Sequence, residues 1–167
     1  MAEVTDNGVV CHTSGELPAV GSAAPDFRLV TGDLEDVTLA TYRGKTKVLN
    51  IVPSLDTRVC AISARKFNEK AASIPSAVVL VISADLPFAM RRFCSTEGLH
   101  NVVPLSMMRS RGFAKSYGTL LTDGPMEGIS ARAVVVIDGA DKVVYAQLVP
   151  DIGQEPDYAA ALAAAGR

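Results

Sequence analysis

The segment that most restricts the fold of this chain is Ala77–Ser83, which reads AVVLVIS. A strand with one face in water alternates apolar and polar residues, whereas this run is apolar on both faces. Such a run is typical of a buried parallel strand that is covered by helices on both sides. A second apolar strand, Lys47 to Val52, precedes it, and a helical pattern lies between the two. The order strand, helix, strand predicts an α/β fold with a parallel centre.

Local signals on either side of this centre predict the next elements. The Asn7-Gly8 pair between short alternating segments predicts a tight hairpin near the N-terminus. After the central strand, Ser83 or Asp85 is expected to cap a helix that begins near Pro87, because proline is favoured in the first helical turn. Gly98 is expected to end that helix.

The C-terminal third predicts a hairpin followed by a helix. Two apolar segments, Ala133–Ile137 and Val143–Leu148, flank a turn of glycine and aspartate and indicate antiparallel strands. An alanine-rich helix is expected to begin near Pro156 and Asp157. The complete order predicts an α/β sandwich with a mixed central sheet flanked by helices, and an N-terminal β-hairpin.

Composition limits the size and the partners of this fold. The chain has 167 residues, of which 49% are apolar and 20% charged. This is enough for one core, and we expect a single domain over residues 1–167, with residues 1–20 as a hairpin extension. The net charge of −2 and the absence of a long basic run argue against nucleic acid or an anionic membrane as a partner.

The N-terminus and the cysteine count predict a cytoplasmic location. The first twenty residues lack the basic start and long apolar core of a secretory signal. No apolar segment reaches the roughly 20 residues of a membrane-spanning helix. Three cysteines, an odd number, do not suit a fully paired structural framework.

The stretch Asn50–Phe67 carries the reactive group that the sequence predicts. It runs from a strand through Pro53 and a polar turn, and it places Cys60 at the start of a helical pattern. The free N–H groups and the positive dipole end of a first helical turn favour thiolate over thiol, and the thiolate is the nucleophile. Thr57 can cap the helix or turn its hydroxyl toward the sulfur. Arg58 and Arg65 add positive charge nearby or face solvent.

The spelling Pro53-x₃-Thr57-x₂-Cys60 resembles the active-site pattern of the peroxiredoxins. Further segments resemble their thiol peroxidase branch, the atypical two-cysteine peroxiredoxins, and the likeness extends from about Val20 to the C-terminus. These segments are SADLPFAMRRFC (83–94), EGLHNVVPLS (97–106), YGTLLTDGPMEG (117–128) and ARAVVVID (131–138). The resemblance implies a thioredoxin-like fold.

The resemblance also implies roles for individual residues. Cys60 is expected to attack the peroxide and Cys94 to resolve the sulfenic acid through an intramolecular disulfide. Arg132 and Thr57 are expected to act on the thiolate and the transition state, while Pro53 walls the pocket against water. Implied with these roles are hydrogen peroxide and alkyl hydroperoxides as substrates, thioredoxin as reductant, a homodimer, and no cofactor. Taken alone, Cys94 also fits a core position of its helix, and Arg132 a strand edge.

Two other functions share this fold. A thiol–disulfide oxidoreductase normally carries two cysteines two residues apart, but the position after Cys60-Ala61-Ile62 is Ser63. A redox sensor in which Cys60 and Cys94 switch a surface without turnover stays open. Cys11 is expected to be a bystander, and the set Cys11, His12, Cys94 and His100 has no recognisable metal-ligand spacing. Relatives more often carry a small residue or proline where this chain has Arg58.

Overall fold

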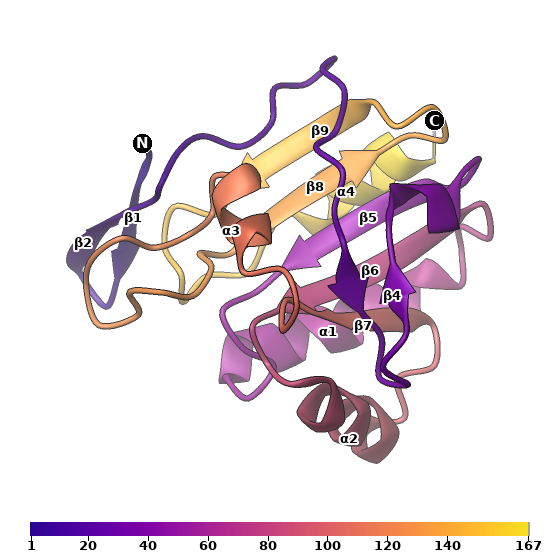
Figure 1. Ribbon diagram of the computed structural model, residues 1–167, viewed down its shortest axis with the longest axis horizontal. Helices are drawn as coiled ribbons and strands as arrows, with labels where there is room; N and C mark the ends of the chain where they lie inside the picture. The colour runs from indigo at the N-terminus through magenta and orange to yellow at the C-terminus, as the bar shows by residue number, and fades with distance from the viewer. Residues whose placement is uncertain (167) are drawn as a thin grey trace.

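A mixed seven-stranded sheet forms the centre of the computed structural model, which describes residues 1–166 (Figure 1). The strands lie in the order β4-β3-β7-β6-β5-β8-β9, and a separate hairpin, β1–β2, lies near the N-terminus. The strand bounds are β1 Glu3–Asp6, β2 Val9–His12, β3 Leu29–Val30, β4 Asp36–Val37, β5 Thr46–Ile51, β6 Ala77–Ser83, β7 Val102–Ser106, β8 Ala133–Ile137 and β9 Val143–Leu148.

The parallel part of the sheet is centred on β6, the apolar run Ala77–Ser83 that predicts a buried parallel strand. Strand β6 pairs in parallel with β5 on one side and with β7 on the other. Strand β8 then runs antiparallel to β5, with Ala133 opposite Ile51. This pairing brings the start of β8 beside the end of β5, the two places from which the residues of the predicted site emerge.

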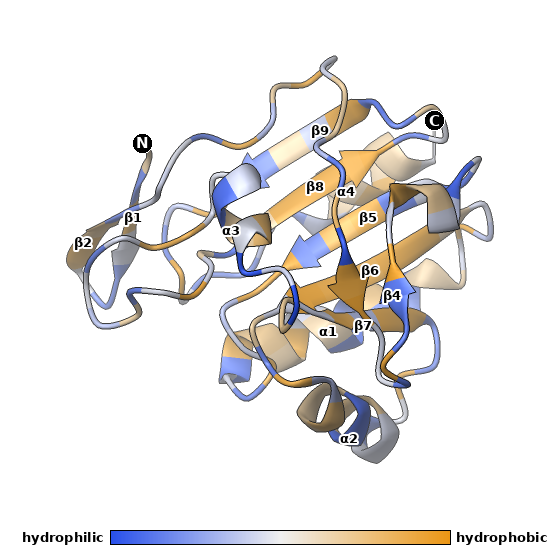
Figure 2. Ribbon diagram, in the orientation of Figure 1, coloured by the Kyte–Doolittle hydropathy of each residue, from blue (hydrophilic) through white to orange (hydrophobic). Residues whose placement is uncertain are grey.

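Helices cover the two faces unequally (Figure 1). Helices α1 (Arg58–Ala71), α2 (Pro87–Glu97) and α4 (Tyr158–Ala165) pack against one face, where they share an apolar cluster with β5, β6 and β8. The other face is covered by the short α3 (Gly112–Ser116), the 3₁₀ helix η1 (Leu39–Tyr42) and the chain around Phe27. The central strands are apolar almost throughout (Figure 2). No helix within residues 1–166 is long and apolar enough to cross a membrane.

Several local predictions are confirmed. The first hairpin turns at Asn7 and Gly8, which both have positive φ angles of 49° and 82°. Strands β8 and β9 form the expected antiparallel pair. Helix α4 begins after Asp157, whose carboxylate accepts a hydrogen bond from the Ala160 N–H at 3.0 Å. Each of these features depends on residues that are close in sequence, which is why their pattern is readable.

The predicted cap of α2 is wrong. The residue that precedes the helix is Leu86, and no side chain caps the first turn. Pro87 does occupy the first turn, and Gly98 ends the helix in the left-handed conformation with a φ of 68°. The Asp85 carboxylate turns away from α2 and accepts hydrogen bonds from the loop that precedes Cys60.

Candidate active site

Cys60 lies in the first turn of α1, with its side chain completely buried. Thr57 is the capping residue directly before the helix, which begins at Arg58, so Cys60 is the third helical residue. The backbone N–H groups of a first helical turn lack partners within the helix and favour a negative charge beside them. The thiol is unpaired, as are those of Cys11 and Cys94. The sulfur is therefore held in the helix position that the sequence predicts.

Arg132 supplies a cation to the Cys60 sulfur. Its Nη2 donates to Cys60 Sγ at 3.2 Å, and its Nε donates to the Ile152 carbonyl at 3.1 Å. Arg132 immediately precedes β8, and the antiparallel pairing of β8 with β5 brings it next to the chain that enters the Cys60 loop. Only 1% of the residue is exposed to solvent. A guanidinium held in this way places a positive charge beside the Cys60 sulfur.

The remaining nitrogen of this guanidinium has no protein partner. Arg132 Nη1 is buried without a hydrogen bond, and no carboxylate of residues 1–166 forms an ion pair with the side chain. Burying a cation without an anionic partner is costly, so such groups are rare outside functional sites. A negatively charged sulfur and a bound polar ligand together supply the anionic partner and the hydrogen-bond acceptor that the Arg132 guanidinium lacks.

Thr57 and Pro53 lie in the loop that leads to Cys60, but they differ in exposure. Thr57 is exposed, and its hydroxyl donates to the Ser54 carbonyl at 2.9 Å instead of capping α1. That bond directs the proton toward the backbone and leaves the oxygen lone pairs free to accept. Pro53 is buried directly after Val52, and it has no N–H to bind water.

The two arginines of α1 that are close to Cys60 in sequence form no hydrogen bond with its sulfur within residues 1–166. Arg58 is exposed, and Arg65 forms an ion pair with Glu97 of α2, with 2.9 Å between Nε and Oε2. Hydrogen bonding to Arg65 lowers the pKa of Glu97. Of the three arginines considered from the sequence, only Arg132 thus contacts Cys60, and Arg65 instead ties α1 to α2.

Cys94 lies on α2 in the same apolar cluster as Cys60. The residue is 9% exposed, and burial raises the pKa of its thiol to about 11. A buried protonated thiol is a poor nucleophile, because the thiolate is the reactive form. In this conformation the Cys94 thiol is therefore held in its protonated, less reactive form.

Two buried polar residues close to Cys60, Asn50 and Ser63, were not predicted from the sequence as site residues. The Ser63 hydroxyl donates to the Cys60 carbonyl at 3.0 Å and accepts a hydrogen bond from Asn50 Nδ2 at 3.2 Å. Both side chains are fully buried. Position 63 is the place of the second cysteine in a thiol–disulfide oxidoreductase, and here its hydroxyl fixes the helix turn that carries Cys60. Only the polar character of Asn50 within an apolar strand signals this contact in the sequence.

Cys11 lies apart from the other two cysteines. It is buried in β2, within a small cluster formed by the N-terminal hairpin, Leu121, Ala131 and Ile152. Burial, followed by the charges of Asp123 and Asp6, raises the pKa of its thiol. It contributes to packing of the hairpin, and the structure does not bring it to the Cys60 loop.

Comparison with known proteins identifies the class. Residues 19–162 match the family model described as Redoxin, so the chain belongs to the Redoxin family. A thiol peroxidase of Leptospira interrogans is 52% identical over 167 residues, with 99% of this chain and 98% of that protein covered. A thiol peroxidase of Mycobacterium bovis is 53% identical over 166 residues, with 99% of each chain covered.

Solved structures agree with this assignment. A peroxiredoxin-like protein from Aquifex aeolicus superposes with a TM-score of 0.91 at 39% identity, covering 98% of this chain and 96% of that one. A thiol peroxidase from Chromobacterium violaceum superposes with a TM-score of 0.89 at 27% identity, covering 95% and 91%. The thioredoxin-like fold, the resemblance to thiol peroxidases and the expected class of enzyme, a thiol-dependent peroxidase, are thus confirmed.

Proposed function

We propose that Cys60 is the peroxide-attacking residue of this chain and that Arg132 is its electrostatic partner. The observation that carries the proposal is the contact of 3.2 Å between the buried Arg132 guanidinium and the Cys60 sulfur at a helix start. The unpartnered Nη1 supports it further, because it offers a donor to a bound ligand. The whole chain acts as one domain, with residues 1–20 as an extension.

The first step oxidises the sulfur by two electrons. The Cys60 thiolate attacks the terminal oxygen of a hydroperoxide, so that an S–O bond forms while the O–O bond breaks. The leaving alkoxide, or hydroxide from hydrogen peroxide, takes a proton from solvent, and Cys60 becomes a sulfenic acid. Arg132 stabilises the negative charge as it moves from sulfur to oxygen, and Thr57 accepts a hydrogen bond from the peroxide.

The second step forms a disulfide. The Cys94 thiol loses its proton, its thiolate attacks the sulfenic sulfur of Cys60, and the S–S bond forms while the S–O bond breaks. The leaving hydroxide takes up a proton and departs as water. An external dithiol then reopens the disulfide by exchange and leaves as its own disulfide. The burial of Cys94 and its raised pKa explain why this step waits until the local structure opens.

Organic hydroperoxides as substrates beside hydrogen peroxide follow from the family resemblance. A pocket of about 220 Å³ lies at the end of the sheet where β6 and β7 end. Its lining mixes Leu86, Met107 and Ile129 with Arg111 and Ser130, and neither Cys60 nor Arg132 is part of it. The pocket therefore does not distinguish between the two kinds of peroxide.

The reductant and the assembly follow from the family resemblance. We assign thioredoxin as the dithiol, a homodimer as the assembly and the cytoplasm as the location. Peroxide consumption with thioredoxin, compared with glutathione at equal thiol concentration, tests the first assignment, and sedimentation velocity tests the second.

The Cys60→Ser variant tests the function itself. It should abolish turnover of both hydrogen peroxide and an organic hydroperoxide, because a serine alkoxide is not available near neutral pH. Steady-state peroxidase assays with thioredoxin and its reductase measure this, and Cys11→Ser, which removes a cysteine of the hairpin, should keep the parental rate. Near-parental activity of Cys60→Ser would refute the assignment.

The same assay separates the other functions. A sensor is oxidised once, whereas an enzyme consumes many equivalents of peroxide. A thiol–disulfide oxidoreductase needs a second thiol at position 63, but the Ser63 hydroxyl is engaged with the Cys60 carbonyl.

A further inference from the structure

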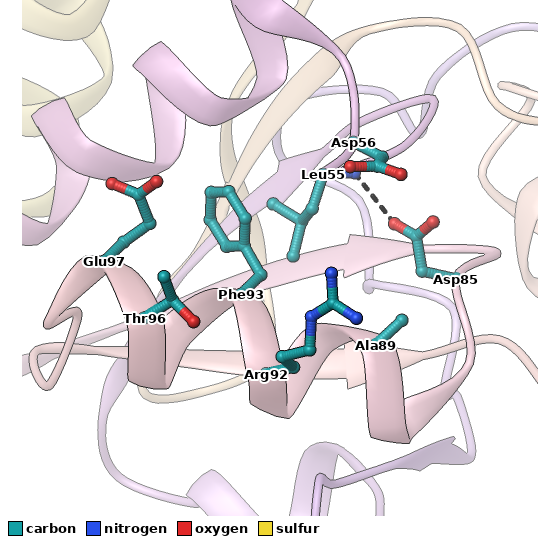
Figure 3. Close-up of a pocket in the computed structure, with 8 residues that line it drawn as sticks. All are labelled: Leu55, Asp56, Asp85, Ala89, Arg92, Phe93, Thr96 and Glu97. Carbon is teal, nitrogen blue, oxygen red and sulfur yellow. Dashed lines mark hydrogen bonds between the residues drawn. The ribbon is translucent and has the colours of Figure 1, made fainter.

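The Asp85 carboxylate is bound by three donors from two segments of the chain. Asp85 follows β6 and lies two residues before α2. Its oxygens accept hydrogen bonds from Ser54 Oγ at 2.7 Å, the Leu55 N–H at 2.8 Å and Ser83 Oγ at 2.6 Å. Figure 3 shows the carboxylate pointing at the Leu55 N–H across the edge of a groove. Ser54 and Leu55 belong to the loop that leads to Cys60.

Within residues 1–166 this carboxylate forms no ion pair, although Arg92 of α2 lines the same groove (Figure 3). No lysine, arginine or histidine in the described part of the chain forms an ion pair with Asp85. Its charge is compensated by neutral donors, and hydrogen bonds to a charged acceptor are about twice as strong as neutral ones. The residue is itself anchored, because its carbonyl accepts from the Ser106 hydroxyl of β7. Asp85 is therefore a fixed point to which the Cys60 loop is attached.

The attachment continues through the loop to Thr57. Ser54 Oγ donates to Asp85 and accepts from the Asp56 N–H at 3.1 Å. The Ser54 carbonyl accepts from the Thr57 hydroxyl at 2.9 Å and from the Thr57 N–H at 3.2 Å. The position of Thr57, three residues before Cys60, thus depends on the position of Ser54.

A groove separates this loop from the helix that carries Cys94. Its volume is about 290 Å³, and Leu55 and Asp56 face Ala89, Phe93 and other residues of α2 across it (Figure 3). Asp85 and Glu97 lie at opposite ends of the groove. At the Asp85 end, hydrogen bonds join the Cys60 loop to the chain entering α2, and at the other end Glu97 pairs with Arg65 of α1.

We propose that Asp85 is a positioning residue that holds the Cys60 loop in shape for peroxide attack and releases it for disulfide formation. The proposal rests on the roles proposed above for Cys60 and Cys94. A disulfide requires Cα atoms within about 7 Å of each other, and we expect the start of α1 to unwind when Cys60 is joined to Cys94. Unwinding the start of α1 moves Ser54 and Leu55 and breaks their bonds to Asp85. The same carboxylate therefore favours the first step and opposes the second.

The Asp85→Asn variant should move the two steps in opposite directions. The asparagine side chain has the same shape as aspartate but no charge. Its NH₂ group replaces one carboxylate oxygen, so at least one of the three donors to Asp85 loses its acceptor. Formation of the Cys60 sulfenic acid should slow by roughly tenfold, since bonds to a charged group are lost. Formation of the Cys60–Cys94 disulfide should quicken by roughly three- to tenfold, because the folded loop is less stable. Rapid quenching after addition of hydrogen peroxide, with mass spectrometry of trapped sulfenic acid and disulfide, measures both rates.

Two further variants accompany Asp85→Asn. Asp56→Asn removes a carboxylate from the same loop and the same groove, but no hydrogen bond involves the Asp56 side chain within residues 1–166, so both rates should stay parental. Ser54→Ala removes one of the three donors to Asp85 and should shift both rates in the same senses as Asp85→Asn, by less. The double variant of Ser54 and Asp85 should show less than the sum of the two effects.

Rates that both fall, or that match Asp56→Asn, would overturn the proposal and leave Asp85 with a structural role alone. If Asp85→Asn does not fold, Ser54→Ala decides by the same criterion. A parent protein that forms sulfenic acid but no Cys60–Cys94 disulfide would overturn both the resolving role of Cys94 and the release step. This outcome would leave the role of Cys60 intact, because the rate of sulfenic acid formation is measured on Cys60 and does not depend on Cys94.

Discussion

Arg132 combines three properties that are seldom found in one arginine: it is buried, it contacts a sulfur, and it forms no ion pair with a carboxylate of residues 1–166. Arginine stays charged at any accessible pH, so its pairing with Cys60 does not depend on its own protonation. The fixed hydrogen bond from Nε to the Ile152 carbonyl orients the plane of the guanidinium. The Ile152 carbonyl thus sets the direction of the Arg132 N–H that donates to the Cys60 sulfur.

Replacing Arg132 by Met should slow sulfenic acid formation by about 10²–10³, the usual effect of losing one preorganised donor. Rapid quenching with trapped sulfenic acid measures the rate. Arg132→Lys keeps the charge without the planar donor pair and should recover part of the rate. An unchanged rate in Arg132→Met would exclude the proposed role, and circular dichroism checks that the variant is folded.

At the scale of elements, α1 and α2 each carry one of the two cysteines proposed to react, and the Arg65–Glu97 pair joins the helices at their exposed side. Asn68 of α1 also accepts a hydrogen bond at 2.8 Å from the N–H of Asn101, which lies between α2 and β7. A disulfide requires Cα atoms within about 7 Å of each other, and we expect part of one helix to unwind when it forms. In the proposed function, the reduced fold is the form that attacks the peroxide.

Oxidation should loosen the two helices. After one equivalent of peroxide, mass spectrometry should find Cys60 joined to Cys94 within one chain, and amide hydrogen exchange should quicken near both residues relative to the reduced protein. The Cys94→Ser variant should stall after one turnover with thioredoxin and become overoxidised at Cys60, because its sulfenic acid has lost its partner. A disulfide from Cys60 to Cys11, or between chains, would contradict the assignment of Cys94.

The Glu97→Gln variant should quicken disulfide formation by roughly two- to threefold. Both partners of the ion pair with Arg65 are partly exposed, so its loss has a small effect on the packing of α1 and α2. The rate of sulfenic acid formation should stay parental, because neither residue contacts Cys60. Glu69→Gln removes an exposed charge of α1 that forms no ion pair within residues 1–166, and it serves as control. A disulfide rate equal to that of this control would show that the pair does not restrain the helices.

At the scale of the whole molecule, the N-terminal hairpin is attached to the loop between Leu121 and Ser130. His12 Nδ1 lies 2.6 Å from Asp123 Oδ2, and the His12 N–H donates to the other carboxylate oxygen at 2.7 Å. The hydrogen bond to Asp123 raises the pKa of His12 from its ordinary 6.5, and the hydrogen bond from His12 lowers the pKa of Asp123. Glu3 adds a longer contact to His12 at 3.4 Å.

The sign of the pH dependence follows from these two shifts. The raised pKa of His12 means that its contribution is complete below 6.5 and is lost as pH rises through the folded-state pKa. The lowered pKa of Asp123 means that its contribution is lost as pH falls through its own folded-state value. The pair therefore stabilises the docked hairpin between these limits. Both side chains are partly exposed, so the effect on global stability is small.

Amide exchange in β1 and β2 should accordingly quicken as pH rises above 6.5, after correction for the intrinsic pH dependence of exchange. The Asp123→Asn variant should lose this additional change, because its neutral amide cannot hold the charged imidazole. Glu3→Gln should reduce it only slightly, since its contact with His12 is longer and more exposed. A parental pH profile in Asp123→Asn would show that the pair does not hold the hairpin.

Features that rest on neighbouring residues can be predicted from the amino-acid sequence. The parallel strand β6, the Asn7-Gly8 turn, the hairpin of β8 and β9 and the Asp157 cap are each specified by local periodicity or by a turn residue. The helix position of Cys60 belongs with them, since it follows from the strand, Pro53 and Thr57 that precede it. Such features depend on backbone preferences that act over a few residues.

Which polar groups meet depends on how distant segments of the chain pack. Arg58 and Arg65 are closest to Cys60 in sequence, yet the donor to its sulfur is Arg132, 72 residues away. Asp85 has a suitable place for a helix cap, but its carboxylate binds Ser54 and Leu55, which are 31 and 30 residues earlier. Arg132 is buried and Asp85 is half-buried, so each takes the partners that sheet pairing brings within hydrogen-bond distance. The pairing of β5 with β6 and β8 is a property of the whole chain.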